Sequence, residues 1–162
     1  MVKKSFSLSY LEFDSADELP ASDRELLDCA RNAVESAYAP YSHYRVGSAV
    51  RMGNGKICTG SKQENMACPS GLCAERVALY AAASAYPGIP VEAIAITARS
   101  SQFPVEKPVP PCGSCRQAMI EYEMYSQQKI RVILMGEKGK VLVVESIETL
   151  LPLSFKEDGL KK

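Results

Sequence analysis

The order of apolar and polar residues along the chain switches between helical and strand-like periods. Over residues 24–38 apolar side chains recur every three or four positions, which predicts an amphipathic helix with Ser22 as its N-cap that Pro40 brings to an end. Residues 44–52 are strand-like, the Gly-Asn-Gly sequence at 53–55 predicts a turn, and residues 56–60 are predicted to pair back as a hairpin.

The rest of the chain continues this alternation. A polar loop leads to an alanine-rich helix from residue 73, which Pro87 and Gly88 stop, and then to a buried strand over residues 91–98. Further on, a proline-rich loop separates these elements from a helix, two strands and a short helix, predicted over residues 113–125, 131–135, 140–144 and 146–152. Such alternation predicts an α/β fold with helices on both faces of one sheet.

The N-terminal segment, residues 1–20, has a pattern of its own. Phe6, Leu8 and Tyr10 alternate with polar residues, and Leu11 and Phe13 follow, which predicts a short strand or an extended arm. At 162 residues the chain is long enough for one compact domain and too short for two ordinary ones. We therefore expect an N-terminal extension over residues 1–20 and a single domain over residues 21–162.

The net charge of the chain limits the kinds of molecule that it is expected to bind. Lysine plus arginine and aspartate plus glutamate number 19 each, so the formal net charge is zero. This balance provides no basic field for a nucleic-acid backbone or an anionic membrane, and it favours a small-molecule substrate. No apolar run approaches the roughly 20 residues that would span a bilayer. Low net charge also gives little repulsion between copies, which is compatible with a homo-oligomer.

Six cysteines stand in a sequence whose first residues, MVKKSFSLSYLEF, contain no unbroken apolar stretch of the kind found in signal peptides. We therefore expect a cytoplasmic protein with reduced thiols, some of which bind metal rather than form disulfides. Cys29 in a predicted helix and Cys58 in a predicted strand are expected to be ordinary core thiols.

Three of the other cysteines lie at the predicted starts of two helices. Cys73 opens the sequence Cys-Ala-Glu-Arg, and Cys112 and Cys115 belong to Pro-Cys-Gly-Ser-Cys-Arg. Three thiolates that include a C-x-x-C pair favour zinc, which takes soft sulfur ligands in a tetrahedron. Three protein ligands leave a fourth corner for water, as catalytic zinc requires. A helix N-terminus carries about half a positive charge, so thiols placed there ionise readily.

The residues beside these cysteines add acid–base chemistry and charge. Glu75, two positions after Cys73, could take a proton from water at the open corner and deliver it to a substrate ring nitrogen and to a leaving amine. Three thiolates on a divalent ion leave one surplus negative charge, which Arg76 and Arg116 could offset. This combination predicts a zinc-dependent hydrolytic deaminase.

Other interpretations of the cysteines are possible. A lone C-x-x-C pair is more often a redox motif or part of a structural zinc site. A thioredoxin-like motif would follow the first strand of a βαβ unit, whereas this pair follows a proline-rich loop late in the chain. Structural zinc usually has four protein ligands; Cys68 is a conceivable fourth, while His43 lies far from the cysteines in sequence. Two ligand motifs that each open a helix favour a catalytic site.

With these motifs the chain resembles the small, homotetrameric, zinc-dependent cytidine deaminase family. The match includes AYAPYSHYRVG from Ala37, GLCAERVAL, PPCGSCRQ and LLPLSF, which ends at Phe155. The resemblance implies a three-layer α/β/α sandwich whose five-stranded mixed sheet is flanked by helices, within a catalytic domain over residues 21–162. It also implies Zn²⁺ on three cysteines and hydrolysis of cytidine or deoxycytidine to the uridine product, a reaction of pyrimidine salvage.

The resemblance assigns roles to particular residues. Cys73, Cys112 and Cys115 match the zinc ligands, and Glu75 matches the proton shuttle. The backbone around Ala74 matches the group that meets the pyrimidine carbonyl.

Several pocket positions are matched as well, and two depart from the family. Glu64 matches an acidic residue that accepts from a ribose hydroxyl, and Phe155 matches an aromatic that reaches into a neighbouring subunit's site. Tyr44 stands where a phenylalanine usually lines the base pocket. Lys62 stands where the family commonly has a ribose-binding asparagine, and Cys68 where it has a tyrosine. These departures leave the preferred nucleoside open.

Two alternatives remain open at this stage. One is a deaminase of another aminopyrimidine, such as blasticidin S, since those enzymes share the zinc motifs; Phe155 favours a nucleoside enzyme, whereas Lys62 and Cys68 leave the substrate open. The other is a zinc-stabilised binding protein without catalysis, against which Glu75 argues. Purine and polynucleotide deaminases commonly have a histidine where Cys73 stands.

Overall fold

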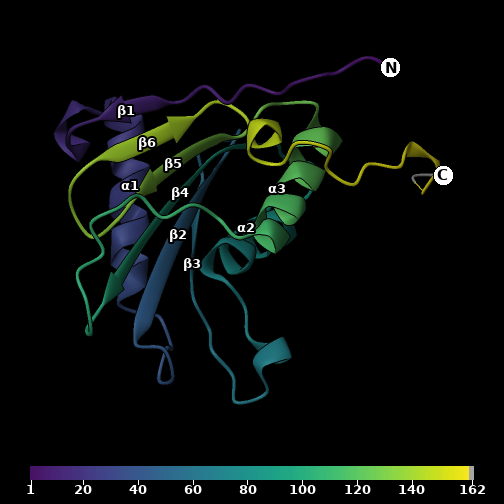
Figure 1. The fold of residues 1–162 in the computed structure, drawn as a ribbon. Coiled ribbons are helices and arrows are strands. Elements are labelled where there is room, and N and C mark those ends of the chain that lie inside the picture. The colour runs from purple at the N-terminus through teal and green to yellow at the C-terminus, as the bar shows by residue number, and fades with distance from the viewer. Residues whose placement is uncertain (161–162) are drawn as a thin grey trace.

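The structure is a computed structural model that describes residues 1–160. Within them the chain forms one mixed six-stranded sheet in the order β1-β6-β5-β4-β2-β3 (Figure 1). Strands β4 and β5 are parallel, and the other neighbouring pairs are antiparallel. The strands are β1 Leu11–Phe13, β2 Tyr44–Met52, β3 Ile57–Ser61, β4 Val91–Ser100, β5 Arg131–Met135 and β6 Val141–Val144.

Helices cover both faces of this sheet, as the sequence predicts. Helix α1 (Ala21–Val34) lies behind the sheet in Figure 1, and α2 (Ala74–Ala85) and α3 (Gly113–Ser126) lie in front of it. The result is a three-layer arrangement. Four short 3₁₀ turns complete the described chain: η1 Ala16–Glu18, η2 Cys68–Ser70, η3 Ile147–Leu150 and η4 Asp158–Leu160.

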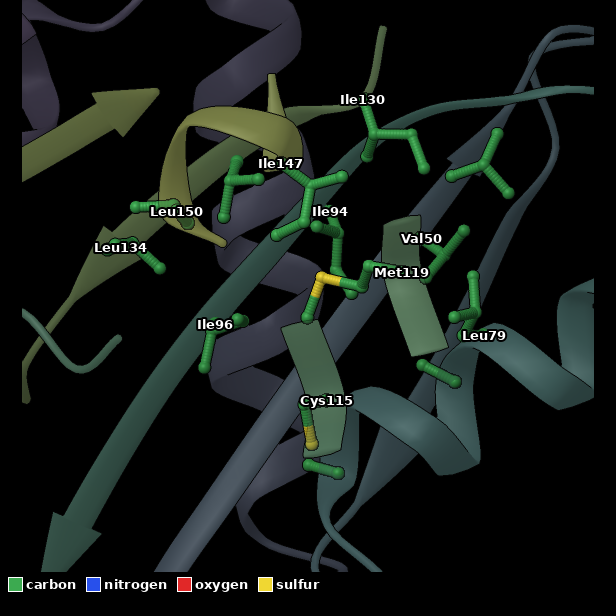
Figure 2. Packing of buried hydrophobic residues seen from close by; sticks show 14 of the residues in the cluster. Val50, Leu79, Ile94, Ile96, Cys115, Met119, Ile130, Leu134, Ile147 and Leu150 are labelled. Atoms are coloured by element: carbon green, nitrogen blue, oxygen red, sulfur yellow. The ribbon is translucent and has the colours of Figure 1, made fainter. Parts of the chain in front are cut away.

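The two faces of the sheet carry side chains of different size. On β4, Ala93 and Ala95 pack in the cluster with α1, whereas Ile94 and Ile96 pack in the cluster with α2 and α3 (Figure 2). Alternation along a strand places successive side chains on opposite faces. The small residues allow α1 to lie close to the sheet. The thicker cluster on the other face supports the helices that carry the candidate metal ligands.

The sheet has six strands, so the expectation of five was wrong. The additional strand is β1, which comes from residues 1–20 and pairs antiparallel with β6, with Leu11 opposite Val143 and Phe13 opposite Val141. The family resemblance begins at Ala37 and therefore carries no information about this strand. The extension thus contains a short strand, as one of its two predicted forms, and covers the edge of β6.

The first helix differs from its predicted bounds. It begins at Ala21 with Pro20 rather than Ser22 as its N-cap, and it ends at Val34 rather than near Tyr38. The backbone N–H of Tyr38 instead donates to the Lys62 carbonyl at 2.9 Å. The chain therefore leaves the helix early to pair with the segment after β3, and this pairing shapes one wall of the candidate site.

The remaining elements lie close to their predicted positions. Strand β4 extends two residues further, to Ser100, and the predicted helix over residues 146–152 is the 3₁₀ turn η3. Among residues 1–160 no helix is long and apolar enough to cross a membrane.

Candidate active site and metal centre

Three cysteine sulfurs converge where α2 and α3 begin. Cys73 is the N-cap of α2, Cys112 is the N-cap of α3, and Cys115 lies in the first turn of α3. Their Sγ atoms all lie within 4.8 Å of one another, and Cys112 and Cys115 are 3.5 Å apart. Figure 2 shows Cys115 at the end of the buried cluster that also holds Met119. Two distant sequence motifs thus form one cluster.

Close packing holds the start of α2 in place. A side-chain carbon added at Gly60 on β3 would lie 2.3 Å from the Ala78 nitrogen and 2.6 Å from the Ala74 oxygen. Only glycine therefore allows β3 to approach the first turns of α2. This contact fixes the helix that carries Cys73 and Glu75.

A buried carboxylate anchors α3. Glu123 accepts from the Ser146 hydroxyl at 2.6 Å and from the Ile130 and Ile147 backbone N–H groups at 2.8 and 3.0 Å. These bonds join α3 to η3 and to the start of β5. They set the position of the helix whose first turn carries Cys112 and Cys115.

The donor set fits a zinc ion. Zn–S bonds of about 2.3 Å in a tetrahedron place sulfurs roughly 3.8 Å apart, close to the separations found here. Within residues 1–160 only Cys73, Cys112 and Cys115 form such a group; Cys68 is exposed on η2 and lies outside it. The conceivable fourth ligand is therefore not in place. Three sulfurs leave one corner of the tetrahedron open.

The pKa values of two of the thiols are shifted in opposite directions. A hydrogen bond with Cys115 and the nearby Arg76 guanidinium lower the pKa of the Cys73 thiol to about 5. The same hydrogen bond, together with burial, raises the pKa of the Cys115 thiol. Cys73 is therefore the thiol of this pair that ionises more readily.

Glu75 is the carboxylate beside the sulfurs. It lies in the first turn of α2 with only 5% of its surface exposed. Burial, followed by the negative charge of Cys73, raises the pKa of its carboxyl. A carboxyl with a raised pKa accepts a proton more readily than an ordinary one, which suits a proton shuttle.

The two arginines make different contacts. Arg76 points a guanidinium nitrogen at Cys73 Sγ, 3.9 Å away, and its Nε is buried without a hydrogen-bond partner. Arg116 donates instead to the Pro111 carbonyl at 2.8 Å and the Leu150 carbonyl at 2.6 Å. Arg76 is therefore the arginine in contact with a sulfur, whereas Arg116 fastens the loop before α3 to η3.

A cavity of about 650 Å³ reaches the sulfur group at Cys73. Its wall is the segment between β3 and α2, and its charged side chains are Lys62, Glu64 and Arg76. Lys62 and Glu64 form an ion pair at 2.9 Å. The sequence-derived pocket residues Lys62 and Glu64 thus share one space with the candidate metal centre.

Tyr44 is half-buried at the start of β2 and is not among the residues that line this cavity. Burial and the charge of Glu75 raise the pKa of its hydroxyl. Phe103 stacks on it with ring centroids 6.0 Å apart. No sequence motif points to Phe103, because its place beside Tyr44 depends on how the proline-rich loop folds.

The other two predicted contacts lie at opposite extremes of burial. Ala74 is fully buried as the first residue of α2, where helix N–H groups have no partner within the helix. Phe155 is exposed and outside the cavity lining, and its carbonyl accepts from the Gln117 side chain at 3.1 Å. Within one chain the structure does not bring Phe155 to the site.

Comparison with known proteins agrees with this geometry. The family model described as the cytidine and deoxycytidylate deaminase zinc-binding region matches residues 20–130. A cytidine deaminase of Halalkalibacterium halodurans is 37% identical over 139 residues, which cover 85% of this chain and 98% of that protein. A cytidine deaminase of Sporosarcina psychrophila is 34% identical over 137 residues, which cover 84% of this chain and 93% of that protein.

Solved structures show the same fold. The crystal structure of a cytidine deaminase from Burkholderia pseudomallei has a TM-score of 0.70 and 38% sequence identity, over 81% of this chain and 97% of that one. The matched segment of the family model contains all three clustered cysteines and Glu75. The chain therefore belongs to the zinc-binding cytidine and deoxycytidylate deaminase family.

Proposed function

We propose that this protein hydrolyses cytidine and deoxycytidine to uridine and deoxyuridine with release of ammonia. The observation that carries the proposal is the placement of buried Glu75 next to three sulfurs that leave one metal corner open. Relatives over most of the chain are named cytidine deaminase, which supports the same substrate. In the reaction a water oxygen bonds to C4 of the ring, and the C4–N bond to the amine breaks.

Cys73, Cys112 and Cys115 would hold the zinc ion. When bound, zinc supplies a Lewis acid that makes water a nucleophile near neutral pH. Glu75 would take a proton from the attacking water and give it to ring nitrogen N3. It would then carry the second proton to the departing amine, so that ammonia leaves and Glu75 ends ionised as it began.

Other residues of the chain would bind and orient the base. The N–H at Ala74 faces no partner within its helix and would meet the pyrimidine carbonyl. Tyr44, stacked on Phe103, would line the base pocket. Arg76 would offset the surplus negative charge of the three thiolates, which its contact with Cys73 supports, while Arg116 would contribute at longer range.

The cavity favours a neutral nucleoside. Its one lysine, Lys62, is already paired with Glu64, and Arg76 faces Cys73. A nucleotide phosphate would require an uncommitted cation at this end of the cavity. We therefore propose the nucleoside, within pyrimidine salvage, as the substrate class.

We also propose that the active form is a homo-oligomer, by resemblance a tetramer, in which Phe155 of one copy completes the site of another. The exposure of Phe155, Leu153 and Met66 supports this, because large apolar side chains at a surface are typical of protein interfaces. We propose a cytoplasmic location, since all six cysteines are free thiols and the metal centre needs three of them reduced.

Turnover of cytidine, deoxycytidine, cytosine and blasticidin S, measured by ultraviolet absorbance and ammonia release, tests this function. We expect hydrolysis of the two nucleosides. Hydrolysis of blasticidin S alone would favour the other aminopyrimidine enzyme. Absence of ammonia from every compound, with zinc bound, would favour a non-catalytic binding protein.

A further inference from the structure

Lys62 and Glu64 line the cavity, and the Ser42 side chain, which lies outside that lining, forms hydrogen bonds with both of them. Lys62 and Glu64 follow β3, and Ser42 lies in the loop before β2. The two segments are held in register by backbone bonds from Tyr38 N–H to the Lys62 carbonyl at 2.9 Å and from Glu64 N–H to the Tyr38 carbonyl at 2.8 Å. The three side chains therefore meet in a fixed arrangement rather than by chance contact at a surface.

The Glu64 carboxylate receives four hydrogen bonds. It accepts from the Tyr41 and Ser42 backbone N–H groups at 2.9 and 3.3 Å, from Lys62 Nζ at 2.9 Å, and from the Ser42 hydroxyl. An ionised carboxylate has about four lone-pair positions for donors. The acceptor capacity of Glu64 is therefore filled by the protein itself.

The hydrogen-bonding groups of the Lys62 and Ser42 side chains also all have partners. The ammonium of Lys62 has three protons and three acceptors, namely Glu64, Ser42 Oγ at 2.9 Å and the Tyr44 carbonyl at 3.2 Å. The Ser42 hydroxyl donates to Glu64 and accepts from Lys62 and from the Tyr44 N–H at 3.1 Å. We call Ser42, Lys62 and Glu64 the closed network, because each of their donors and acceptors has a partner.

We propose that Lys62 determines substrate specificity by occupying Glu64, so that the enzyme is indifferent to the 2′- and 3′-hydroxyl groups of the nucleoside sugar. This inference rests on the proposed nucleoside deamination. Glu64 is the one carboxylate that lines the cavity, and thus the strongest acceptor for a sugar hydroxyl. A hydroxyl can reach it only by displacing Lys62 or Ser42, which exchanges one bond to a charged group for another with little net gain.

The hydrogen bonds of the network also favour the ionised form of Glu64. Hydrogen bonds from Ser42 and Lys62 lower the pKa of the Glu64 carboxyl to about 2. Lys62 further lies 5.7 Å above the Tyr44 ring, which favours the cation at that place. Neither group needs the substrate as a partner.

The test compares kcat/KM for cytidine, 2′-deoxycytidine and 2′,3′-dideoxycytidine. In the unmodified enzyme we expect the three values to agree within about threefold, since no charged acceptor is left to lose. Lys62→Met frees one lone pair of Glu64 and adds no donor and only a weak acceptor, the thioether sulfur. A hydrogen bond to a charged group then becomes available to the sugar, and the cytidine to dideoxycytidine ratio should rise about tenfold or more.

Controls separate this role from a general effect. Lys56→Met changes an exposed lysine in the β2–β3 turn and should leave the ratio unchanged. Ser42→Ala removes a different donor from Glu64 and should raise the ratio in the same direction, which covers the case in which Lys62→Met does not fold. Calorimetric binding of uridine and 2′,3′-dideoxyuridine gives a readout independent of turnover and should show the same change.

The outcomes distinguish two failures. If cytidine is hydrolysed but the unmodified enzyme prefers it to dideoxycytidine by more than about thirtyfold, a sugar hydroxyl does bind strongly and the inference is wrong. An unchanged ratio in both Lys62→Met and Ser42→Ala also overturns it. If the zinc-loaded protein hydrolyses none of the three nucleosides, the proposed function itself fails and the inference with it.

Discussion

The two ends of the candidate site are built in different ways. At the metal end, Cys73, Cys112, Cys115 and Glu75 lie at helix N-termini that close packing and a buried carboxylate hold in place. At the other end, called the sugar end because we propose that the nucleoside sugar lies there, the closed network joins two loops through side-chain hydrogen bonds. The metal end has ligand atoms free to bind zinc and a coordination position free for substrate chemistry. At the sugar end, every hydrogen-bonding group of the closed network already has a partner in the protein.

This difference separates chemistry from selectivity. Reaction at C4 needs an open metal corner and a carboxylate that gains and loses protons, and the first end provides both. The second end is satisfied without the substrate, so it contributes shape more than hydrogen bonds. Changes at the metal end should therefore alter kcat or folding, and changes at the sugar end should alter the comparison between related substrates.

The largest effect is expected at Glu75. Glu75→Gln keeps the size of the side chain but removes the base, so kcat should fall by roughly 10²–10⁴-fold or more. Zinc content, measured by metal analysis, should stay the same because Glu75 is not a ligand. Glu25→Gln on the exposed side of α1 serves as the control. Near-normal turnover in Glu75→Gln would mean that another residue moves the protons.

The next largest effect is expected on stability, at the contact between β3 and α2 that holds the metal end in place. Gly60→Ala places a carbon against the backbone of α2 and should lower the free energy of unfolding by about 1–3 kcal/mol, as overpacking does. Gly113→Ala is the matched control, since nothing lies within 4 Å of the added carbon. Chemical denaturation measures both. Equal stability of the two variants would contradict the close approach of β3 and α2.

A smaller effect is expected at Phe155. If its ring completes the site of a neighbouring copy, Phe155→Ala should raise KM about tenfold, the loss expected for one good aromatic contact, with little change in kcat. Phe6→Ala, an exposed aromatic in the N-terminal extension, is the control. Sedimentation analysis reports the assembly state. A fully active monomer would refute the shared site.

The smallest effect is an acid dependence of stability. The pKa of Glu64 is lowered from 4.5 to about 2 by its hydrogen bonds with Ser42 and Lys62. A lowered folded-state pKa stabilises the protein above the unfolded value, and this contribution is lost as pH falls from about 4.5 towards 2. Glu64→Gln should flatten that part of the stability curve. A curve of unchanged steepness would place the acid sensitivity elsewhere.

The residues of the metal end can be predicted from the sequence more completely than the contacts of the sugar end. The cysteine spacing and the adjacent Glu75 are local signals, and helix starts can be recognised from neighbouring residues. The family resemblance points to Lys62 and Glu64. It does not show that every hydrogen-bond donor and acceptor of these two side chains already has a partner in the protein. That complete set of partners depends on Ser42, which reaches them only because the chain leaves α1 early and pairs with the Lys62 segment.

The fold shows the same limit. The helices and five of the strands follow from periodicity, since each buries one face over several turns or residue pairs. Strand β1 has three residues and gains its structure from β6, a partner more than a hundred residues away in sequence. Its alternation allowed either a strand or an arm, and only the tertiary pairing decides between them.

We propose that one zinc ion on three cysteines, with Glu75 as the proton shuttle, deaminates cytidine. The most direct measurement is cytidine turnover of the purified protein as a function of its zinc content. We predict activity proportional to zinc, saturating at about one ion per chain, because three thiolates form one site with an open corner. Full activity in protein that contains no zinc would contradict the claim.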